Sequence, residues 1–322
     1  MRVSVVIPSF DAGRFLVEAV ASVRVQSYRD VEIIVVDDGS TDGSVDAVEA
    51  QRGVVVVRLD RGGGPRARNV GLTRATGDAV VFLDADDLLG PDTIAAQVAA
   101  LERAPRRAVA VAPWRLLVQR DGVWGSVPHR IPHGPDPFAD WLVRRYQLSA
   151  ALLWPVALVR ELGGWDEALT KNQDGDLALR ALVSGVGLVP AAARTFAHYR
   201  QAGPHGGTVA SRTRAIDVAS CVLVIDRIAD TLARQGRFER YRVAIARAYH
   251  ELARLYWFAE PALASRCETL ALALAGRSSV SGTWAHRTLT RVVGLAHKER
   301  IASSLAAFGL GRELRLARAV PR

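Results

Sequence analysis

Four short and largely apolar runs, each long enough for one buried strand, set the architecture of the N-terminal part of this chain. They are Val3–Ile7, Val31–Val36, Val54–Arg58 and Ala79–Leu83. Segments with helical spacing of apolar residues separate them, and such alternation predicts parallel strands joined by right-handed crossovers. Unbroken apolar runs are typical of strands that are buried on both faces. We therefore expect an α/β fold with a mostly parallel central sheet and flanking helices.

Acidic residues follow two of these predicted strands directly. Asp37 and Asp38 follow the second strand, and Asp84, Asp86 and Asp87 follow the fourth. The carboxyl ends of parallel strands form the ligand-binding edge of an open sheet, so the two groups should converge there. Clustered carboxylates repel one another unless a cation lies among them, and Mg²⁺ or Mn²⁺ bridging two phosphates suits them. Helix capping is the simpler explanation, but it fits Asp84 and Asp86 less well, because an entirely apolar strand precedes them.

The pattern changes after the predicted sheet strands. Trp114–Gln119 and Val123–Val127 flank an Asp-Gly pair, which predicts a β-hairpin. A third acidic pair, Asp174 and Asp176, opens a predicted helix, where the helix dipole favours carboxylates. The sequence is helical in character from about Ser211 onward. We therefore expect a catalytic domain over residues 1–210 and an all-helical extension over residues 211–322.

Positive charge is concentrated in the predicted extension. The chain of 322 residues has a formal net charge of +9. Residues 212–322 hold 19 of its 42 Lys and Arg residues but 9 of its 33 Asp and Glu residues. This asymmetry suggests an anionic partner, such as the face of a membrane, for the C-terminal part. The alternative is that the arginines decorate the solvated faces of ordinary helices.

The remaining composition points to a cytoplasmic protein that binds no nucleic acid. Met1 leads directly into a predicted strand, so we expect no signal peptide. No apolar stretch approaches the ~18 uncharged residues that a membrane-spanning helix needs. Cys221 and Cys267 lie far apart in apolar surroundings and are expected to be reduced core residues. The apolar and basic segment Arg287–Arg318 could pack in the core or make a peripheral contact with the inner face of the plasma membrane.

Five motifs in series carry a resemblance to a known family. They read VSVVIPSFD, VVDDGSTD, GGPRARNVGL, GDAVVFLDADD and GGWDE, and they lie between Met1 and Arg200. In order and spacing they resemble the inverting family 2 glycosyltransferases of the GT-A fold. One such motif is weakly specific, whereas five in the family order are strongly specific.

The resemblance implies a nucleotide-sugar donor and a divalent metal ion, Mn²⁺ or Mg²⁺. It implies that Asp38 binds the base, that Arg68 lies beside the base and ribose, and that Asp86 ligates the metal. The residues expected to contact the nucleotide sugar are Pro8, Phe10, Asp38, Gly39, Arg68 and Asp84. Asp84 is also a candidate metal ligand, and the adjacent Asp87 is a further contributor.

The resemblance also assigns the acceptor side. Trp165 and Asp166, in the GGWDE motif, are expected near the acceptor. Asp174 matches the family's catalytic base, although Gln173 stands where many members have glutamate. A carboxylate base would take the proton from an acceptor hydroxyl, which attacks the anomeric carbon opposite the leaving diphosphate and inverts its configuration. The QxxRW motif of processive members is absent, which predicts the transfer of one sugar per encounter.

Two histidines in HYRQAGPHGGTV are candidates to complete the metal site or to cover the diphosphate. His198 is the stronger candidate, and His205 is the weaker one. A lone histidine in a loop is more often simply solvated, and this alternative stays open.

We therefore predict a metal-dependent enzyme that moves one sugar, with a UDP-sugar as the expected donor. The acceptor would be a glycan, a lipid-linked molecule or a small molecule, in cell-surface glycan, polysaccharide or glycolipid synthesis. One alternative is an inert scaffold subunit of a glycan-assembly complex, which the joint presence of Asp38, Asp84, Asp86 and Asp174 disfavours. Another is a sugar nucleotidyltransferase, which would need a glycine- and lysine-rich first loop where this chain has Pro8–Gly13.

Overall fold

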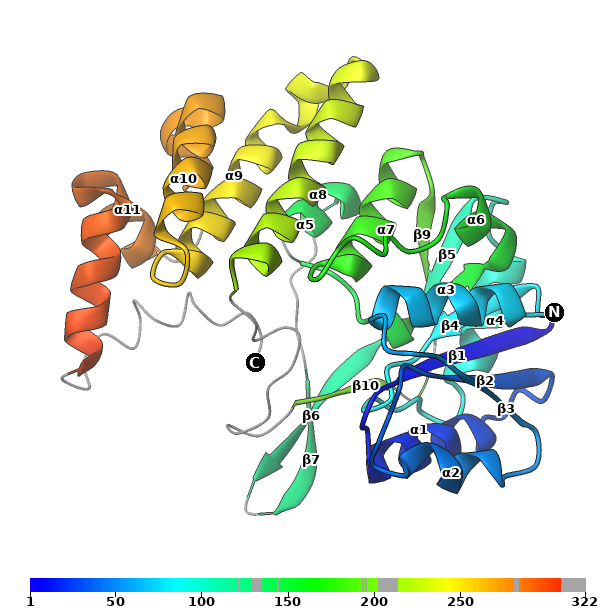
Figure 1. The fold of residues 1–322 in the computed structure, drawn as a ribbon. Helices are drawn as coiled ribbons and strands as arrows, with labels where there is room; N and C mark the ends of the chain where they lie inside the picture. The colour runs from blue at the N-terminus through cyan, green and yellow to red at the C-terminus, as the bar shows by residue number, and fades with distance from the viewer. Residues whose placement is uncertain are drawn as a thin grey trace. The chain divides into compact units, whose positions relative to one another are not determined.

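The chain divides into two compact units (Figure 1). The computed structural model describes residues 1–120, 122–128, 135–143, 145–192, 194, 196–201, 214–280 and 284–307. The first unit comprises Met1–Ile131, Tyr146–Ala168 and Asp176–Gly206. The second comprises Pro132–Arg145, Leu169–Gly175 and Gly207–Arg322. The second unit thus takes two short segments from the earlier part of the chain, and the single boundary at residue 210 stays a prediction.

Within the described residues, a seven-stranded sheet in the order β3-β2-β1-β4-β8-β5-β9 forms the centre of the first unit. Its strands are β1 (Val3–Ser9), β2 (Val31–Asp37), β3 (Val54–Arg58), β4 (Ala79–Phe82), β5 (Ala108–Val111), β8 (Leu152–Pro155) and β9 (Gly187–Pro190). The four predicted strands form β1 to β4 and pair in parallel. β8 runs antiparallel to β4 and β5. The predicted α/β fold with a mostly parallel sheet is confirmed.

Helices cover both faces of this sheet (Figure 1). One face carries Val3, Val5 and Ile7 and packs against α1 (Arg14–Arg24), α2 (Ser44–Glu49) and α4 (Thr93–Glu102). α3 (Gly64–Arg74) contacts β1 and β2, and α6 (Val156–Glu161) contacts β4 and β8. Each fully buried aliphatic side chain contributes about 1.5–3 kcal/mol to such a core. The parallel register then brings the carboxyl ends of β1, β2 and β4 to one edge.

A smaller sheet lies beside that edge. It consists of β10 (Ala197–Arg200), β6 (Trp114–Arg120) and β7 (Val123–Pro128), in that order. β6 and β7 form the predicted hairpin. The His198 amide donates to the Leu88 carbonyl at 2.8 Å, and the Leu88 amide donates back to the His198 carbonyl at 3.1 Å. This bridge holds β10 alongside the segment that follows β4.

The second unit is helical. It contains α5 (Pro137–Leu142), α8 (Ala215–Arg234), α9 (Phe238–Tyr256), α10 (Pro261–Ala275) and α11 (Trp284–Ala307). α9 packs against α5, α8 and α10, with the Phe138 and Tyr241 rings edge-to-face at 4.7 Å. Cys221 and Cys267 are buried and not bonded to each other, as predicted. In the part of the chain that the structure describes, no helix has the length and apolarity that crossing a membrane requires.

Glu32 joins three elements at the amino edge of the large sheet. Its Oε1 accepts hydrogen bonds from Ser4 Oγ at 2.5 Å, from the Thr76 amide at 2.7 Å and from the Gly77 amide at 3.1 Å. Its Oε2 accepts from Thr76 Oγ1 at 2.8 Å and pairs with Arg2 Nη2 at 3.1 Å. Burial alone would raise the pKa of Glu32, but the hydrogen bonds from Ser4 and Thr76 and the Arg2 charge together lower it.

Replacing Glu32 by glutamine should destabilise the protein in a pH-dependent way. The native carboxyl binds its proton more weakly than the unfolded one, so its contribution is present above the unfolded pKa of about 4.3 and is lost as the pH falls below it. We expect Glu32→Gln to lower the free energy of unfolding by about 1–3 kcal/mol at pH 7, and by less at pH 4. Urea denaturation at both pH values measures this, with the exposed Glu49→Gln as the control. A pH-independent loss would contradict the assignment.

Candidate functional site

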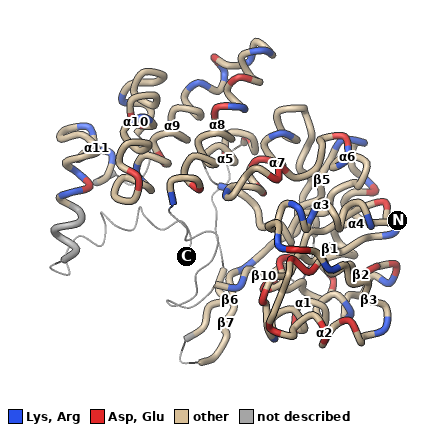
Figure 2. Tube along the Cα trace, in the orientation of Figure 1, with Lys and Arg blue, Asp and Glu red and all other residues tan. Residues whose placement is uncertain are grey.

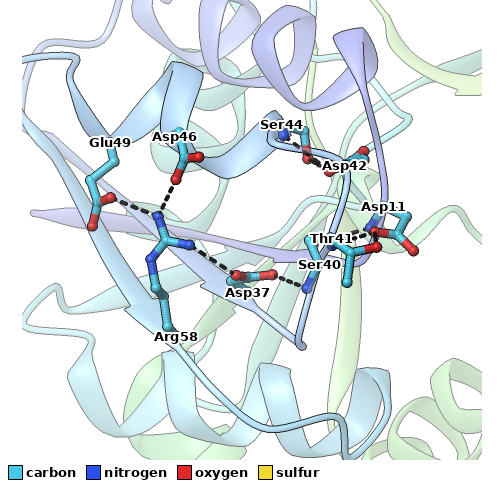
Figure 3. Close-up of polar contacts among 9 residues, drawn as sticks. All are labelled: Asp11, Asp37, Ser40, Thr41, Asp42, Ser44, Asp46, Glu49 and Arg58. Atoms are coloured by element: carbon cyan, nitrogen blue, oxygen red, sulfur yellow. Dashed lines mark hydrogen bonds and ion pairs between the residues drawn. The ribbon is translucent and has the colours of Figure 1, made fainter.

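The loops that follow β1 and β2 are joined by hydrogen bonds between side chains and backbone amides (Figure 3). Asp11 Oδ1 accepts from the Thr41 amide at 2.7 Å, and the Asp11 amide donates to Ser40 Oγ at 3.1 Å. The Gly13 amide donates to Asp42 Oδ2 at 2.7 Å. These bonds shape both loops at the carboxyl edge of the sheet, where an α/β fold places its ligands.

Asp37 has a structural role at this edge. Its Oδ1 accepts a 2.8 Å hydrogen bond from the Ser40 amide, and its Oδ2 lies 3.6 Å from Arg58 Nη1 (Figure 3). Arg58 Nη2 also pairs with Asp46 at 2.6 Å and with Glu49 at 2.7 Å. The first acidic residue of the pair thus ties β2, β3 and α2 together. It is neither solvated nor a helix cap, because it is 3% exposed and Gly43 is the N-cap of α2.

Asp38 supports the glycine-rich loop that opens α3. It is buried, and its two carboxylate oxygens accept from the Gly62 amide at 2.7 Å and from the Gly63 amide at 2.8 Å. Its own amide donates to the Ser9 carbonyl at 2.8 Å. Each carboxylate oxygen keeps a second lone pair. The predicted contact between Asp38 and a base stays a prediction, but the loop contact is established.

The wall beside Asp38 carries an aromatic side chain. The Phe10 ring is 37% exposed, and the Arg61 guanidinium carbon lies 3.5 Å above its centroid. Gly39 has φ +82°, and a Cβ there would lie 3.2 Å from the Arg61 backbone nitrogen. Pro8 pairs with Val36 in the parallel ladder. The predicted nucleotide-contacting residues Pro8, Phe10 and Gly39 therefore lie at the same edge as Asp38.

Arg68 connects three of the predicted site motifs. It is buried, and its Nη2 donates to Asp84 Oδ1 at 2.5 Å. Its guanidinium carbon lies 4.7 Å from the centroid of the Trp165 ring, and Phe82 meets that ring edge-on at 5.1 Å. A buried cation is stable only with such partners. Trp165, predicted to face the acceptor, is itself buried and forms the support for Arg68.

Asn69 fixes the turn that carries Trp165. Its Oδ1 accepts from the Trp165 amide at 2.8 Å, and its Nδ2 donates to the Trp165 carbonyl at 2.9 Å and to Glu167 Oε1 at 2.8 Å. The preceding Gly164 has φ +71°, and a Cβ there would lie 2.6 Å from Asn69 Oδ1. Only glycine satisfies both conditions. Asp166 Oδ1 accepts from the Ala168 amide at 2.9 Å. Contacts of Trp165 and Asp166 with an acceptor stay predictions.

Three carboxyl groups follow β4 within one turn. Asp84 is partly exposed, with 32% of its side chain accessible. Burial, and then the nearby Asp84 charge, raises the pKa of Asp86 to about 6. Burial, and then the Asp86 and Asp84 charges, raises the pKa of Asp87 well above its usual range. Asp87 Oδ1 accepts from the Arg200 amide at 2.9 Å, while its buried Oδ2 has no hydrogen-bond partner among the described residues.

This cluster suits a divalent metal ion shared with a ligand. Among the residues that the structure describes, no three His, Cys, Asp or Glu side chains are arranged to hold a metal by themselves. Mg²⁺ and similar ions are often held by one or two carboxylates together with phosphate oxygens and water. A cation would also relieve the repulsion that raises the pKa of Asp86. Asp84 and Asp86 therefore fit as the protein's share of such a site.

His198 lies in β10, opposite Arg115 of β6. It is half-buried, and burial, together with the Arg115 charge, lowers its pKa. Burial, and then the charges of Asp87 and Asp86, raises the pKa of the neighbouring Tyr199. The role of His198 as a metal ligand stays a prediction. His205, the weaker candidate, lies outside the described residues.

The sequence reasoning missed Arg200. This residue is buried, and its charge partly offsets the raised pKa values of Asp86 and Asp87. Its Nη2 pairs with Glu18 at 2.7 Å, and its guanidinium carbon lies 4.4 Å from the Phe15 centroid and 5.1 Å from that of Trp124. The arginine follows the histidine and tyrosine of the HYR motif, but the sequence did not predict a strand there. The first unit thus places Arg68 and Arg200 beside the set of carboxyl groups that follows β4.

Asp174 lies in the first turn of α7 (Gln173–Val183), where the predicted helix begins. Before the helix, Asn172 has φ +59°. A Cβ at Gly175 would lie 2.1 Å from Asn172 Oδ1, so a larger residue at position 175 would displace the Asn172 side chain. Asp176 Oδ2 accepts a 2.8 Å hydrogen bond from Arg180 Nε. Asp176 is therefore engaged within α7.

Comparisons with known proteins agree with these motifs. Residues 4–148 match the model of "Glycosyl transferase family 2". Glycosyltransferase GlyG of Streptococcus pneumoniae is 37% identical over 97 residues, which are 29% of this chain and 32% of that protein. The amylovoran biosynthesis glycosyltransferase AmsB of Erwinia amylovora is 31% identical over 193 residues, 55% of this chain and 63% of that protein. The chain thus spans about a third of GlyG's length and less than two thirds of AmsB's.

Solved structures share the fold at low sequence identity. Residues 1–349 of TarS from Staphylococcus aureus, in complex with UDP-GlcNAc, superpose with a TM-score of 0.61 and 18% identity, over 87% of this chain and 90% of that one. The mannosyltransferase PcManGT from Pyrobaculum calidifontis, in complex with GDP-Man and Mn²⁺, has a TM-score of 0.52 and 21% identity, over 99% and 86%. The region that holds the strands β1 to β4 and their carboxylates is thus similar to glycosyl transferase family 2, and this chain has the GT-A fold of these solved glycosyltransferases.

Proposed function

We propose that this protein transfers one sugar from a nucleotide-diphosphate sugar to an acceptor hydroxyl, with inversion at the anomeric carbon. The observation that carries the proposal is the arrangement of Arg68, Asp84, Asp86 and Asp87 at the carboxyl edge of the parallel sheet. Two buried arginines, Arg68 and Arg200, flank carboxyl groups that repel one another. Such a site suits a ligand that brings both negative phosphates and a divalent cation.

The donor would lie along the loops after β1, β2 and β3. The exposed face of Phe10 suits a base, and Asp38 keeps lone pairs for a base N–H group. Arg68 would lie beside the ribose, with Pro8 and Gly39 lining the loop. TarS was solved with UDP-GlcNAc and PcManGT with GDP-Man, which supports a nucleotide sugar as donor. We propose a UDP-sugar.

Asp84 and Asp86 would hold Mn²⁺ or Mg²⁺, whose charge would stabilise the departing diphosphate when bound. PcManGT was solved with Mn²⁺, which supports a divalent ion here. The positive charge of Arg200 would add to this stabilisation, because a buried guanidinium acts in a medium of low dielectric constant.

On the acceptor side, Asp174 would act as the general base. A carboxylate takes the proton of the acceptor hydroxyl as its oxygen attacks the anomeric carbon from the face opposite the diphosphate. Trp165 would act by supporting Arg68, and Asp166 would lie near the acceptor. Relatives named for amylovoran biosynthesis and for poly(ribitol-phosphate) glycosylation support a glycan or lipid-linked acceptor, with a small molecule as the alternative.

A thermal-shift screen tests the proposed site directly. We expect one donor class among UDP-, GDP- and dTDP-sugars to raise the melting temperature by a few degrees, because a ligand at 100 times its Kd stabilises the native protein by about 2.7 kcal/mol. This rise should require Mn²⁺.

Asp86→Asn should abolish the part of the rise in melting temperature that depends on Mn²⁺. Without metal this variant should be at least as stable as the wild type above pH 6, because the buried carboxylate with its raised pKa disfavours the native state there. No shift with any nucleotide sugar would favour the inert scaffold.

Asp174→Asn tests the base. We expect donor binding within twofold of the wild type and a fall of about 10²–10⁴-fold in transfer, because the amide cannot accept the proton. Calorimetry with UDP and Mn²⁺ measures binding, and the release of UDP from UDP-N-acetylglucosamine, or of GDP from GDP-mannose, measures turnover. Normal turnover in this variant would rule out Asp174 as the base.

We also propose that the helical unit contacts an anionic membrane as a peripheral protein of the cytoplasm. Figure 2 shows basic residues on α8, α9 and α11. On α11, the exposed Arg287 and Arg291 lie within five residues of Val292, which is 76% exposed. Ile301, which is 40% exposed, follows the non-helical Gly294. Exposed apolar groups among basic ones suit the surface of an anionic bilayer. The part of the predicted segment beyond residue 307 lies outside the described residues.

Sedimentation with vesicles tests this contact. We expect the protein to sediment with phosphatidylserine vesicles at low salt and to stay in solution with phosphatidylcholine vesicles, because the attraction is electrostatic. Replacing Arg287 and Arg291 by glutamine should reduce the bound fraction, whereas Arg103→Gln in the first unit should not. Absence of sedimentation with anionic vesicles would exclude the contact.

A further inference from the structure

The turn from Gly163 to Trp165 is held by an arginine of α7. Arg180 Nη1 donates to the Leu162 carbonyl at 2.5 Å, and its Nη2 donates to the Gly164 carbonyl at 2.7 Å. Arg180 Nε donates to Asp176 Oδ2 at 2.8 Å, and 4% of the Asp176 side chain is exposed. The guanidinium therefore makes charge-assisted bonds to the turn and to its own helix at once.

The same turn is held from the other side by α3. Asn69 bonds to both the amide and the carbonyl of Trp165, and the neighbouring Arg68 lies on the Trp165 ring. The positive φ of +71° at Gly164 lets the turn bond to both Asn69 and Arg180. The turn thus links α3, which carries the arginine of the proposed donor site, to α7.

Asp174 lies on α7 two residues before Asp176, and a helical turn is rigid over that distance. We propose that Arg180 is a positioning residue for the reaction: by fixing α7 to the Gly164 turn, it holds the start of that helix, which carries the base, in one place. This inference rests on the proposed function, because it concerns Asp174 as the base. A shift of about 1 Å in such a group can cost 10²-fold in rate, so the clamp has a catalytic consequence beyond stability.

The chain offers a matched control in Arg160. Its Nη2 also donates to two backbone carbonyls, those of Leu72 at 3.1 Å and Ala75 at 3.2 Å. These contacts tie α6 to the end of α3, and they include no atom of α7. Arg160→Gln therefore removes two bonds to backbone carbonyls from the same unit without loosening the proposed positioning, and among the described residues it breaks no ion pair such as that of Arg180 with Asp176.

The experiment compares Arg180→Gln, Arg180→Lys and Arg160→Gln. We expect Arg180→Gln to lower kcat for nucleotide release by about 10–100-fold, with the KM for the donor and the Kd for UDP with Mn²⁺ unchanged within twofold. Arg180→Lys should recover part of the rate, because it keeps the charge. Arg160→Gln should lose comparable thermal stability and keep kcat. Hydrogen exchange of the Leu177 and Ala178 amides, which donate to carbonyls in the first turn of α7, should speed up in Arg180→Gln and not in Arg160→Gln.

A double substitution separates this inference from the proposed function. If Arg180 acts through Asp174, then adding Arg180→Gln to Asp174→Asn should cause no further loss of rate. The positioning role would be overturned if Arg180→Gln lowered the rate of Asp174→Asn by the same factor as that of the wild type, or if hydrogen exchange at the start of α7 were unchanged. Full activity of Asp174→Asn alone would instead overturn the base assignment, while the exchange result would still report on the clamp.

Discussion

The ion pair between the buried Arg68 and the partly exposed Asp84 is the interaction on which the rest of the site depends. Arg68 is 7% exposed, so its charge needs Asp84 and the face of Trp165 to be stable there. Trp165 in turn needs Asn69, and the turn before it needs a glycine. A fully buried pair typically loses about 3–5 kcal/mol when one partner is removed, and the loss is smaller here because 32% of the Asp84 side chain is exposed. Motifs nearly a hundred residues apart are thus tied by one guanidinium.

The sheet and its carboxylate edge could be predicted from the sequence because they depend on local patterns. An apolar run that ends in Asp84 and Asp86 predicts a buried strand with carboxylates at its end, and the structure has both. The antiparallel β8 could not be placed in this way, because its position depends on long-range packing. Arg200 was missed for the same reason. The four residues of β10 are too few to show the alternation of apolar and polar residues that marks a strand, and the β-bridge between His198 and Leu88 is visible only in three dimensions.

The structure also separates residues that looked equivalent in the sequence. Asp37 and Asp38 are adjacent, yet Asp37 pairs with Arg58 while Asp38 holds the amides of Gly62 and Gly63. In HYR, the histidine faces Arg115 across the small sheet, whereas the arginine lies by the carboxylates. Asp37 and Asp38 are consecutive, so their side chains leave the chain in opposite directions. His198 and Arg200 are two residues apart in β10, so alternation does not separate them and their different tertiary neighbours do. The residue types in the sequence indicated a site of carboxylates and basic groups, and the tertiary contacts show which of these residues lie in it.

The central claim is that the edge of the sheet binds a divalent ion and a nucleotide diphosphate together. Electron paramagnetic resonance of free Mn²⁺, titrated with the protein in the presence and absence of UDP, tests it most directly. Because neither ligand alone completes the proposed site, UDP should tighten Mn²⁺ binding by about tenfold or more, and Mn²⁺ should tighten UDP binding by the same factor. Equal Mn²⁺ affinity with and without UDP would contradict the account.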